Sequence, residues 1–141
     1  MFSFPIRVYW EDTDAGGVVY HAQYLCFLER ARTEWLRARG IEQHGTREEH
    51  DLVMAVRSMQ LEFDKPARLD DVLESRLWLR ERRGASFTLV QELWRDADCL
   101  LRASVQVACL HAGAFRPRKL PPWLLEAIGE PNEHEHGDAT R

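Results

Sequence analysis

The sequence of 141 residues has few cysteines, no long apolar run and no excess of positive charge. Its three cysteines (Cys26, Cys99 and Cys109) have no Cys-x-x-Cys spacing, which argues against a disulfide framework or a zinc site and favours reduced thiols in the cytoplasm. No stretch approaches the ~20 apolar residues that span a bilayer, and the first six residues are too interrupted for a secretory signal. The net charge of −4 provides no basic surface for nucleic acid phosphates. We therefore predict a cytoplasmic protein with no transmembrane segment and no nucleic acid partner.

The residues that are present suit one soluble domain. With 45% hydrophobic and 30% charged residues the chain has ordinary core material, and its five Trp and six Phe can fill a core or a partner interface. We predict a single domain over residues 1–129 and a disordered polar tail over residues 130–141. His134, Glu135 and His136 lie in this tail, where a solvated segment is a better interpretation than a metal site. No metal or other cofactor is predicted.

The first part of the chain predicts a strand, a loop and a long helix. Residues that favour β-structure predict a strand over Pro5–Glu11, and the turn-rich segment 12–17 follows. Apolar residues at spacings of three and four then predict a helix over Tyr20–Arg39: Tyr20, Tyr24, Phe27, Leu28, Ala31, Trp35 and Ala38. The charged residues off this stripe are expected to face water or a partner: Glu29, Arg30, Arg32, Glu34 and Arg37. Gly40, preceded by arginines, is typical of a helix end.

The rest of the chain predicts four strands and a short helix. Alternating apolar residues predict strands over residues 53–63, 72–82, 86–95 and 100–110, with turns at Arg83-Gly84 and at residues 96–98. Pro121-Pro122 precedes a short helix over Trp123–Ile128. Short connections favour antiparallel pairing, so we predict an α+β domain with the long helix on one face of an antiparallel sheet. The uncovered sheet surface and the helix ends favour a homo-oligomer, either a dimer or a tetramer.

The segment before the long helix contains the candidate catalytic residues. Asp12 and Asp14 lie in a loop with Gly16 and Gly17, immediately before a helix start whose backbone N–H groups carry partial positive charge. Such N–H groups can stabilise the oxyanion of an attacked carbonyl, and a nearby carboxylate can attack it or activate water. An Asp at this position is also typical of a helix cap or a turn, and the residues alone leave that alternative open.

The segment from Arg7 to Tyr24, RVYWEDTDAGGVVYHAQY, resembles the signature of the 4-hydroxybenzoyl-CoA thioesterase family of hot-dog proteins. Within that family it is most similar to the acyl-CoA thioesterases associated with the Tol–Pal envelope system. The resemblance continues through residues 29–34, 66–71 and 118–121. It implies a hot-dog domain, with a five-stranded antiparallel sheet wrapped on one long central helix, that hydrolyses acyl-CoA to the free acid and CoA.

The resemblance also implies roles for individual residues. Asp14 is the implied catalytic carboxylate, either as nucleophile or as the group that activates water, and Tyr20 is assigned to substrate binding. The backbone N–H around His21 would hold the thioester oxygen. The His21 side chain either orients water or substrate or has a capping or packing role. Asp12 is interpreted as structural.

Basic residues at two places are candidates for the phosphates of CoA. By the same resemblance, Arg82, Arg83 and Arg118 would bind these phosphates, although a solvated surface is the usual explanation of such clusters. An acyl carrier protein is an alternative thioester donor. Two other functions stay open: a non-enzymatic acyl-thioester-binding or adaptor protein of the envelope or lipid-synthesis machinery, and a hot-dog hydratase or dehydratase with a histidine base.

Overall fold

The computed structural model describes residues 1–131. These residues form five strands and three α-helices, together with one turn of 3₁₀ helix at Trp10–Asp12. The strands are β1 (Phe2–Arg7), β2 (Leu52–Phe63), β3 (Val72–Arg83), β4 (Ser86–Arg95) and β5 (Asp98–His111). The helices are α1 (Gln23–Ala38), α2 (Gln43–His50) and α3 (Pro122–Ile128). The predicted disordered tail lies outside the described residues from position 132 onward.

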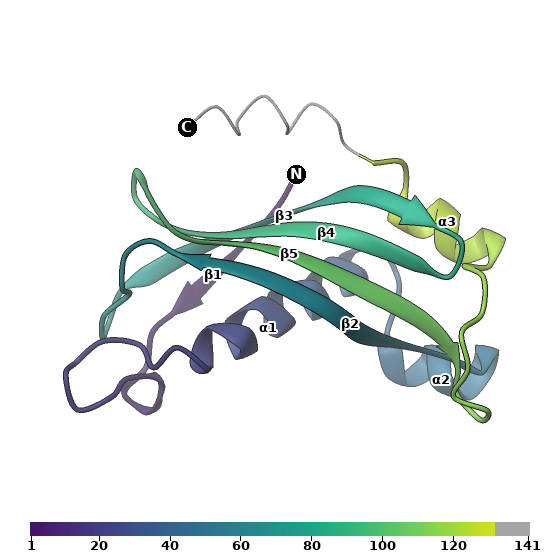
Figure 1. Ribbon diagram of the computed structural model, residues 1–141, viewed down its shortest axis with the longest axis horizontal. Coiled ribbons are helices and arrows are strands. Elements are labelled where there is room, and N and C mark those ends of the chain that lie inside the picture. Colours follow the sequence, from purple (N-terminus) through teal and green to yellow (C-terminus); the bar gives the residue numbers. More distant parts are fainter. Residues whose placement is uncertain (132–141) are drawn as a thin grey trace.

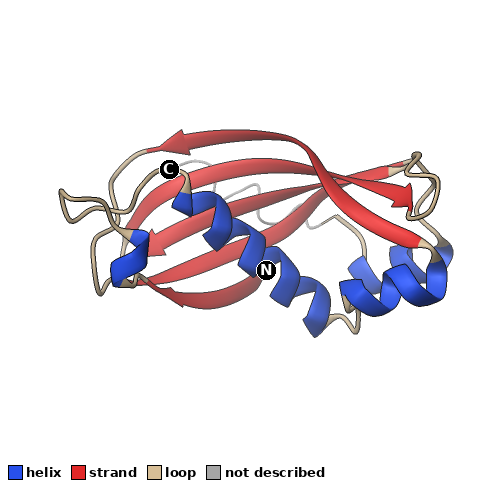
Figure 2. Ribbon diagram, turned by 90° about the horizontal axis from the view of Figure 1, so that it is seen from below, coloured by secondary structure: helices blue, strands red, loops and turns tan. Residues whose placement is uncertain are grey.

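The five strands make one curved sheet in the order β1-β3-β4-β5-β2, and every neighbouring pair is antiparallel. Helix α1 crosses one face of this sheet, as Figures 1 and 2 show from two directions. The tight β3–β4 and β4–β5 turns explain the antiparallel pairing, because a parallel pair would need a long crossover. The predicted α+β architecture with one long helix on the sheet is confirmed.

The hydrophobic core lies between α1 and the sheet. Phe27, Leu28 and Trp35 of α1 are buried, and the Trp35 ring lies 6.2 Å from the ring of Phe87 on β4. Alternate residues of β5 share this face, from Leu101 to Cys109, as their spacing predicts. Each large side chain buried in this layer stabilises the fold by about 1.5–3 kcal/mol relative to an exposed position. Burial also raises the pKa of the Cys109 thiol to about 11, so it stays protonated in the core.

Two predicted boundaries near the N-terminus are wrong. Strand β1 spans Phe2–Arg7 rather than residues 5–11, because the Asp12 carboxylate accepts a hydrogen bond from the Tyr9 N–H and holds the chain in a turn. Helix α1 begins at Gln23 rather than at Tyr20. Tyr20 is therefore exposed before the helix and does not belong to its buried stripe. The predicted helix end is confirmed, since Gly40 adopts a φ of 81°.

Helix α2 was not predicted from the sequence. Its residues are polar, it contains Gly45, and only Thr46 is buried, so it lacks an apolar stripe. Tertiary contacts stabilise it instead. The His50 ring lies 4.5 Å from the Trp123 ring of α3, and the Arg118 side chain donates to the carbonyl oxygen of His50 at 2.9 Å. A cation at the carboxyl end of a helix is favoured by the helix dipole.

Within residues 1–131, none of the helices has the length and apolar character needed to cross a membrane.

Candidate active site

Asp14 lies at the tip of a small hairpin that precedes α1. Thr13 pairs with Val19 across this hairpin, and the Asp14 N–H donates to the Val18 carbonyl oxygen at 2.9 Å. The Asp14 carboxylate is exposed, and its Oδ1 accepts the Gly16 N–H at 2.8 Å. Its Oδ2 has no hydrogen-bond donor among the described residues. One carboxylate oxygen is thus held by the loop while the other is available to a substrate or a water molecule.

Glycine suits both positions that follow Ala15. A Cβ atom added to Gly16 would lie 3.2 Å from Asp14 Oδ1, closer than ordinary van der Waals contact. Gly17 has a φ of 80°, a left-handed conformation that residues with a side chain rarely adopt. The Gly16-Gly17 pair therefore lets the backbone turn tightly around the Asp14 carboxylate.

The start of α1 offers free backbone N–H groups. The N–H groups of Gln23, Tyr24 and Leu25 donate to the carbonyl oxygens of residues 20–22 in a tight first turn. This turn leaves the N–H groups of His21 and Ala22 without an acceptor among residues 1–131. No side chain caps the helix at Ala22, so Asp14 is not a helix cap. Uncapped N–H groups at a helix start attract negative charge, including a developing oxyanion.

The rings of Tyr20 and His21 lie side by side at this helix start. Their centroids are 4.6 Å apart, and both side chains are exposed. The His21 side chain has no hydrogen bond within the described part of the chain, so neither a capping role nor a contact with Asp14 is found for it. Tyr20 and His21 therefore form an exposed aromatic wall next to the free N–H groups.

Asp12 anchors the loop and does not face the solvent. Its side chain is only 3% exposed. Its two carboxylate oxygens accept hydrogen bonds from the Tyr9 N–H at 2.8 Å and from the Gln23 side chain at 2.9 Å. Both oxygens are therefore engaged, and Asp12 links the end of β1 to the first turn of α1. Its structural interpretation agrees with these contacts.

The loop around Ala67 forms hydrogen bonds with residues on both sides of the same helix start. The Ala67 N–H donates to the Tyr24 hydroxyl oxygen at 2.9 Å, and the Ala67 carbonyl oxygen accepts the Val19 N–H at 2.9 Å. Burial raises the pKa of Tyr24, so its hydroxyl is neutral. These two hydrogen bonds tie residues on either side of the helix start to the same loop.

The three candidate arginines lie at the other end of the molecule. Asp14, Tyr20 and His21 are at the end where α1 begins, while the β3–β4 turn lies beside α3 at the opposite end (Figure 1). Arg82 donates to the Leu125 carbonyl oxygen and pairs with Glu130, and Arg118 donates to the carbonyl oxygens of residues 50 and 51. A single chain therefore does not bring the arginines to Asp14.

These arginines differ in the exposure of their side chains and in their polar partners. The Arg82 side chain is 21% exposed, and its guanidinium is engaged by α3 and Glu130. The Arg83 side chain is 80% exposed and pairs only with its neighbour Glu81 among the described residues. Exposed ion pairs of this kind are weak. Of the three candidate arginines, Arg83 is therefore the most readily available to a phosphate.

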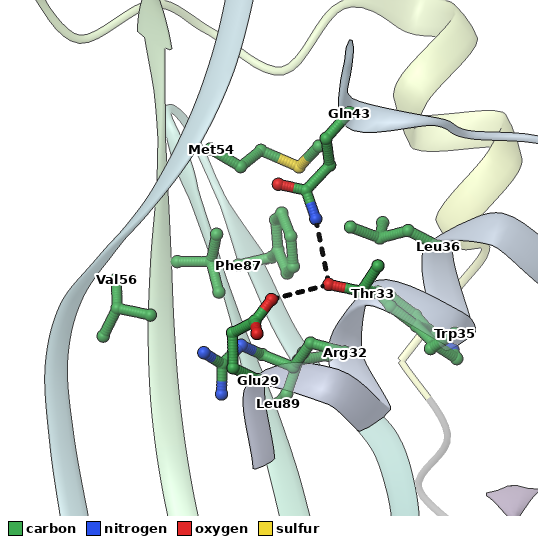
Figure 3. Close-up of a pocket in the computed structure, with 11 residues that line it drawn as sticks. Glu29, Arg32, Thr33, Trp35, Leu36, Gln43, Met54, Val56, Phe87 and Leu89 are labelled. Atoms are coloured by element: carbon green, nitrogen blue, oxygen red, sulfur yellow. Dashed lines mark hydrogen bonds between the residues drawn. The ribbon is translucent and has the colours of Figure 1, made fainter. Parts of the chain in front are cut away.

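A pocket of about 160 Å³ lies between α1 and β2, and we call it the α1–β2 pocket (Figure 3). Its apolar wall includes Val56 of β2 and Phe87 and Leu89 of β4. Its polar lining comes from the helices: Glu29, Arg32 and Thr33 of α1, and Gln43 of α2. Figure 3 shows the Glu29 and Arg32 side chains entering from α1 on the side opposite Val56.

The helix pattern predicted that Arg32 faces water or a partner, but its side chain contacts a buried residue of the sheet in the same chain. Its Nη1 donates to the side-chain oxygen of Gln91 at 3.0 Å, and Gln91 is fully buried and donates to the Leu28 carbonyl oxygen. Burial lowers the pKa of Arg32, an effect that the nearby Glu29 carboxylate opposes. The signal in the sequence was Gln91 itself, a polar residue in the apolar series Phe87, Leu89 and Leu93 of β4.

Comparison with known proteins identifies the class of protein to which these features belong. Residues 8–128 match the family model described as the thioesterase-like superfamily, and the chain belongs to this family. It is 46% identical over 127 residues to the acyl-CoA thioesterase YbgC of Haemophilus influenzae, which covers 90% of this chain and 93% of that protein. It is 45% identical over 126 residues to the acyl-CoA thioester hydrolase YbgC of Escherichia coli, with coverage of 89% and 93%. The solved structure of a probable thioesterase from Bartonella henselae is 36% identical, with a TM-score of 0.81 and coverage of 85% and 98%. The hot-dog fold expected from the sequence is thereby confirmed.

Proposed function

We propose that this protein is an acyl-CoA thioesterase, which hydrolyses acyl-CoA to the free acid and CoA. The observation that carries this proposal is the Asp14 carboxylate, with one free oxygen, on the loop that leads to an uncapped helix start. Two relatives with about 45% identity, named as an acyl-CoA thioesterase and an acyl-CoA thioester hydrolase, support the same chemistry. A protein that only binds acyl groups would have no need for an exposed carboxylate at this position.

In the proposed reaction, the thioester carbonyl oxygen binds to the N–H groups of His21 and Ala22. These donors stabilise the negative charge that develops on this oxygen when the carbonyl carbon is attacked. Asp14 either attacks the carbonyl carbon, forming an anhydride that water then hydrolyses, or removes a proton from the attacking water. Both routes release CoA thiol and leave the acyl group as the free acid.

Steady-state release of CoA thiol tests this activity. We expect the purified protein to release thiol from at least one member of a series of acyl-CoAs that differ in chain length. Hydration of enoyl-CoA without thiol release would indicate a hydratase instead. Binding of acyl-CoA without any turnover would indicate a non-enzymatic binding protein. An acyl carrier protein thioester run in parallel identifies the preferred donor, and an association with the Tol–Pal system stays a prediction.

We further propose that each active site contains residues from two chains. Strand β2 is an edge strand of 12 residues, and its outer edge is unpaired within the described chain. On this strand, the apolar residues Val56 and Phe63 are 42% and 50% exposed. Such an edge exposes unpaired N–H and C=O groups that can pair with a strand of another chain. A second copy of this chain, paired along β2, would provide such a strand.

The symmetry of this proposed dimer determines which residues of the two chains lie close together. A twofold axis that pairs two identical β2 edges makes the two strands antiparallel, and the two α1 helices also run antiparallel. The α1 start of the partner would then lie near the end of the molecule that carries α2, α3 and the β3–β4 turn. The Asp14 loop of the partner would thus approach Arg83 and Arg118, which a single chain holds at the opposite end.

Replacing the proposed phosphate-binding arginines should weaken binding of the CoA portion alone. We expect Arg83→Ala combined with Arg118→Gln to raise KM for acyl-CoA several-fold and to reduce its dependence on salt, because screened charge–charge attraction is lost. The glutamine retains a donor for the end of α2. Arg82 belongs to the same proposed set, but Arg82→Ala would also release α3.

The matched substrate is the acyl-pantetheine thioester, which lacks the nucleotide phosphates. Its KM should scarcely change in the double variant. Arg37→Ala removes one exposed arginine of α1 that pairs with Glu34, and it shows the effect of losing a single positive charge outside the proposed set. Equal losses of activity on both substrates would contradict the phosphate-binding role.

A further inference from the structure

We infer that Phe115 binds the adenine ring of CoA by stacking its exposed ring on the base. This inference rests on the proposed function, because that function identifies CoA as part of the substrate. It goes beyond that function because the arginines proposed above recognise only phosphates, and none of the residues assigned so far contacts the base.

Phe115 is a large apolar residue that the fold does not bury. It lies on the loop that follows β5, at the end of the molecule that carries α2 and α3 (Figure 1). It is 64% exposed and does not belong to the hydrophobic core. A single exposed apolar residue is common in proteins, so exposure alone assigns no role to it. Its ring is nevertheless accessible to a ligand.

The backbone conformation of Phe115 is unusual for its side chain. Its φ is 55°, in the left-handed region that bulky residues rarely adopt. The other residues with a side chain and a positive φ in the described chain are aspartates, at positions 51, 70 and 96. Aspartate tolerates this region because its short polar side chain can form local hydrogen bonds. Glycine or aspartate would therefore make the same turn at lower cost, and the turn does not explain the aromatic ring.

Hydrogen bonds hold the loop that carries this ring. The Phe115 N–H donates to the His111 carbonyl oxygen at 2.7 Å, and the His111 N–H donates to the Arg116 carbonyl oxygen at 2.8 Å. Asp51, which follows α2, ties the same loop to that helix, because its Oδ1 accepts the Gly113 N–H at 2.9 Å. The ring is thus presented on a loop that is ordered before a ligand binds, which reduces the entropy cost of binding.

Cations lie beside Phe115. Arg116 follows it directly and is exposed, and its side chain forms no hydrogen bond or ion pair within residues 1–131. Arg118 lies three positions further on, and Arg83 lies at the same end of the molecule. In CoA, the ribose that carries adenine also carries the 3′-phosphate and the diphosphate. Phosphates bound by these arginines would therefore bring the base to the same loop.

Adenine is the part of CoA that suits an exposed aromatic ring. It is flat and uncharged, and it is the only aromatic group in CoA. The pantetheine arm is a flexible chain with two amides and offers no comparable surface. Stacking between a base and an aromatic side chain contributes substantially to nucleotide binding. Because this contact does not join opposite charges, salt should scarcely weaken it.

Binding of CoA itself tests the inference without requiring turnover. Kd is measured by calorimetry for CoA and for 4′-phosphopantetheine, which lacks adenine. We expect Phe115→Leu and Phe115→Gly to raise Kd for CoA about ten-fold, and Phe115→Trp to leave it within about two-fold, because tryptophan keeps an aromatic face. None of the three variants should change Kd for 4′-phosphopantetheine. The fluorescence of etheno-CoA, in which the base is fluorescent, should be quenched by the wild-type and Phe115→Trp proteins only.

The variants also separate the ring from the loop. Phe115→Leu keeps an apolar side chain at the same positive φ, whereas Phe115→Gly relieves the left-handed conformation and should melt no lower than the wild-type protein. Raising the salt concentration should leave the effect of the Phe115 variants unchanged. The effect of Arg83→Ala combined with Arg118→Gln should become smaller under the same conditions.

The outcomes distinguish this inference from the proposed function. No binding of CoA, an unchanged Kd in both Phe115→Leu and Phe115→Gly, or bound etheno-CoA that is not quenched by the wild-type protein would overturn the inference. Loss of the oligomer in Phe115→Gly, seen by light scattering, would assign the ring to a contact between copies and would also overturn it. Quenching that depends on Phe115, with no thiol release from acyl-CoA by the wild-type protein, would support the inference and overturn the proposed hydrolysis.

Discussion

Asp14→Asn is expected to reduce kcat by about two orders of magnitude or more, the usual scale for losing a general base or nucleophile. Asparagine keeps the shape of the side chain, and its amide oxygen can still accept the Gly16 N–H that Oδ1 accepts in the wild-type protein. The exposed position of Asp14 means that the variant should fold normally. Loss of turnover with an unchanged melting temperature would therefore show that Asp14 takes part in the reaction and is not needed for folding.

Asp12→Asn is the matched control two residues earlier. Its side chain is buried, and both of its oxygens accept hydrogen bonds. An amide would lose one of these acceptors, at a cost of roughly 1–3 kcal/mol for a buried unsatisfied group. We expect a lower melting temperature and a smaller loss of kcat than in Asp14→Asn. The reverse order would mean that Asp12 is the catalytic carboxylate.

The second large effect is expected from mixing two variants that are impaired in different parts of the proposed site. One chain carries Asp14→Asn, and the other carries the Arg83→Ala and Arg118→Gln pair. If each site takes its carboxylate from one chain and its arginines from the other, a mixed dimer contains one intact site and one doubly defective site. Random pairing makes half of the dimers mixed, so mixed dimers should contribute about a quarter of the wild-type activity, in addition to the residual activity of the arginine variant. The assay uses acyl-CoA below KM, where the arginine variant is least active.

A site built within one chain predicts a different result. Each site of a mixed dimer would then carry one defect, and mixing would restore nothing. Light scattering of the same samples establishes whether an oligomer is present. Full activity in a demonstrably monomeric sample would falsify the two-chain site and leave the Asp14 assignment intact.

The sequence by itself was sufficient to predict α1, because its apolar residues repeat with the helical period. It was also sufficient for strands β2 to β5, because their apolar residues alternate and glycine or aspartate marks the turns between them. The position of Asp14 before a helix start is also local, since only a few residues separate them along the chain. Signals of this kind lie within one segment and need no partner to be recognised.

The tertiary structure decided what depends on contacts between distant segments. Helix α2 has no apolar stripe, and contacts with distant segments, among them those of Trp123 and Arg118 with its carboxyl end, stabilise it. Arg32 looks like a solvated residue on the helix pattern, and only the packing of α1 on β4 brings it to Gln91. The separation of Asp14 from Arg83 and Arg118 also follows from the lengths of α1 and the strands, which no local pattern reveals. The contacts of α2 and of Arg32 join residues more than fifty positions apart in the chain, so only the folded structure brings them together.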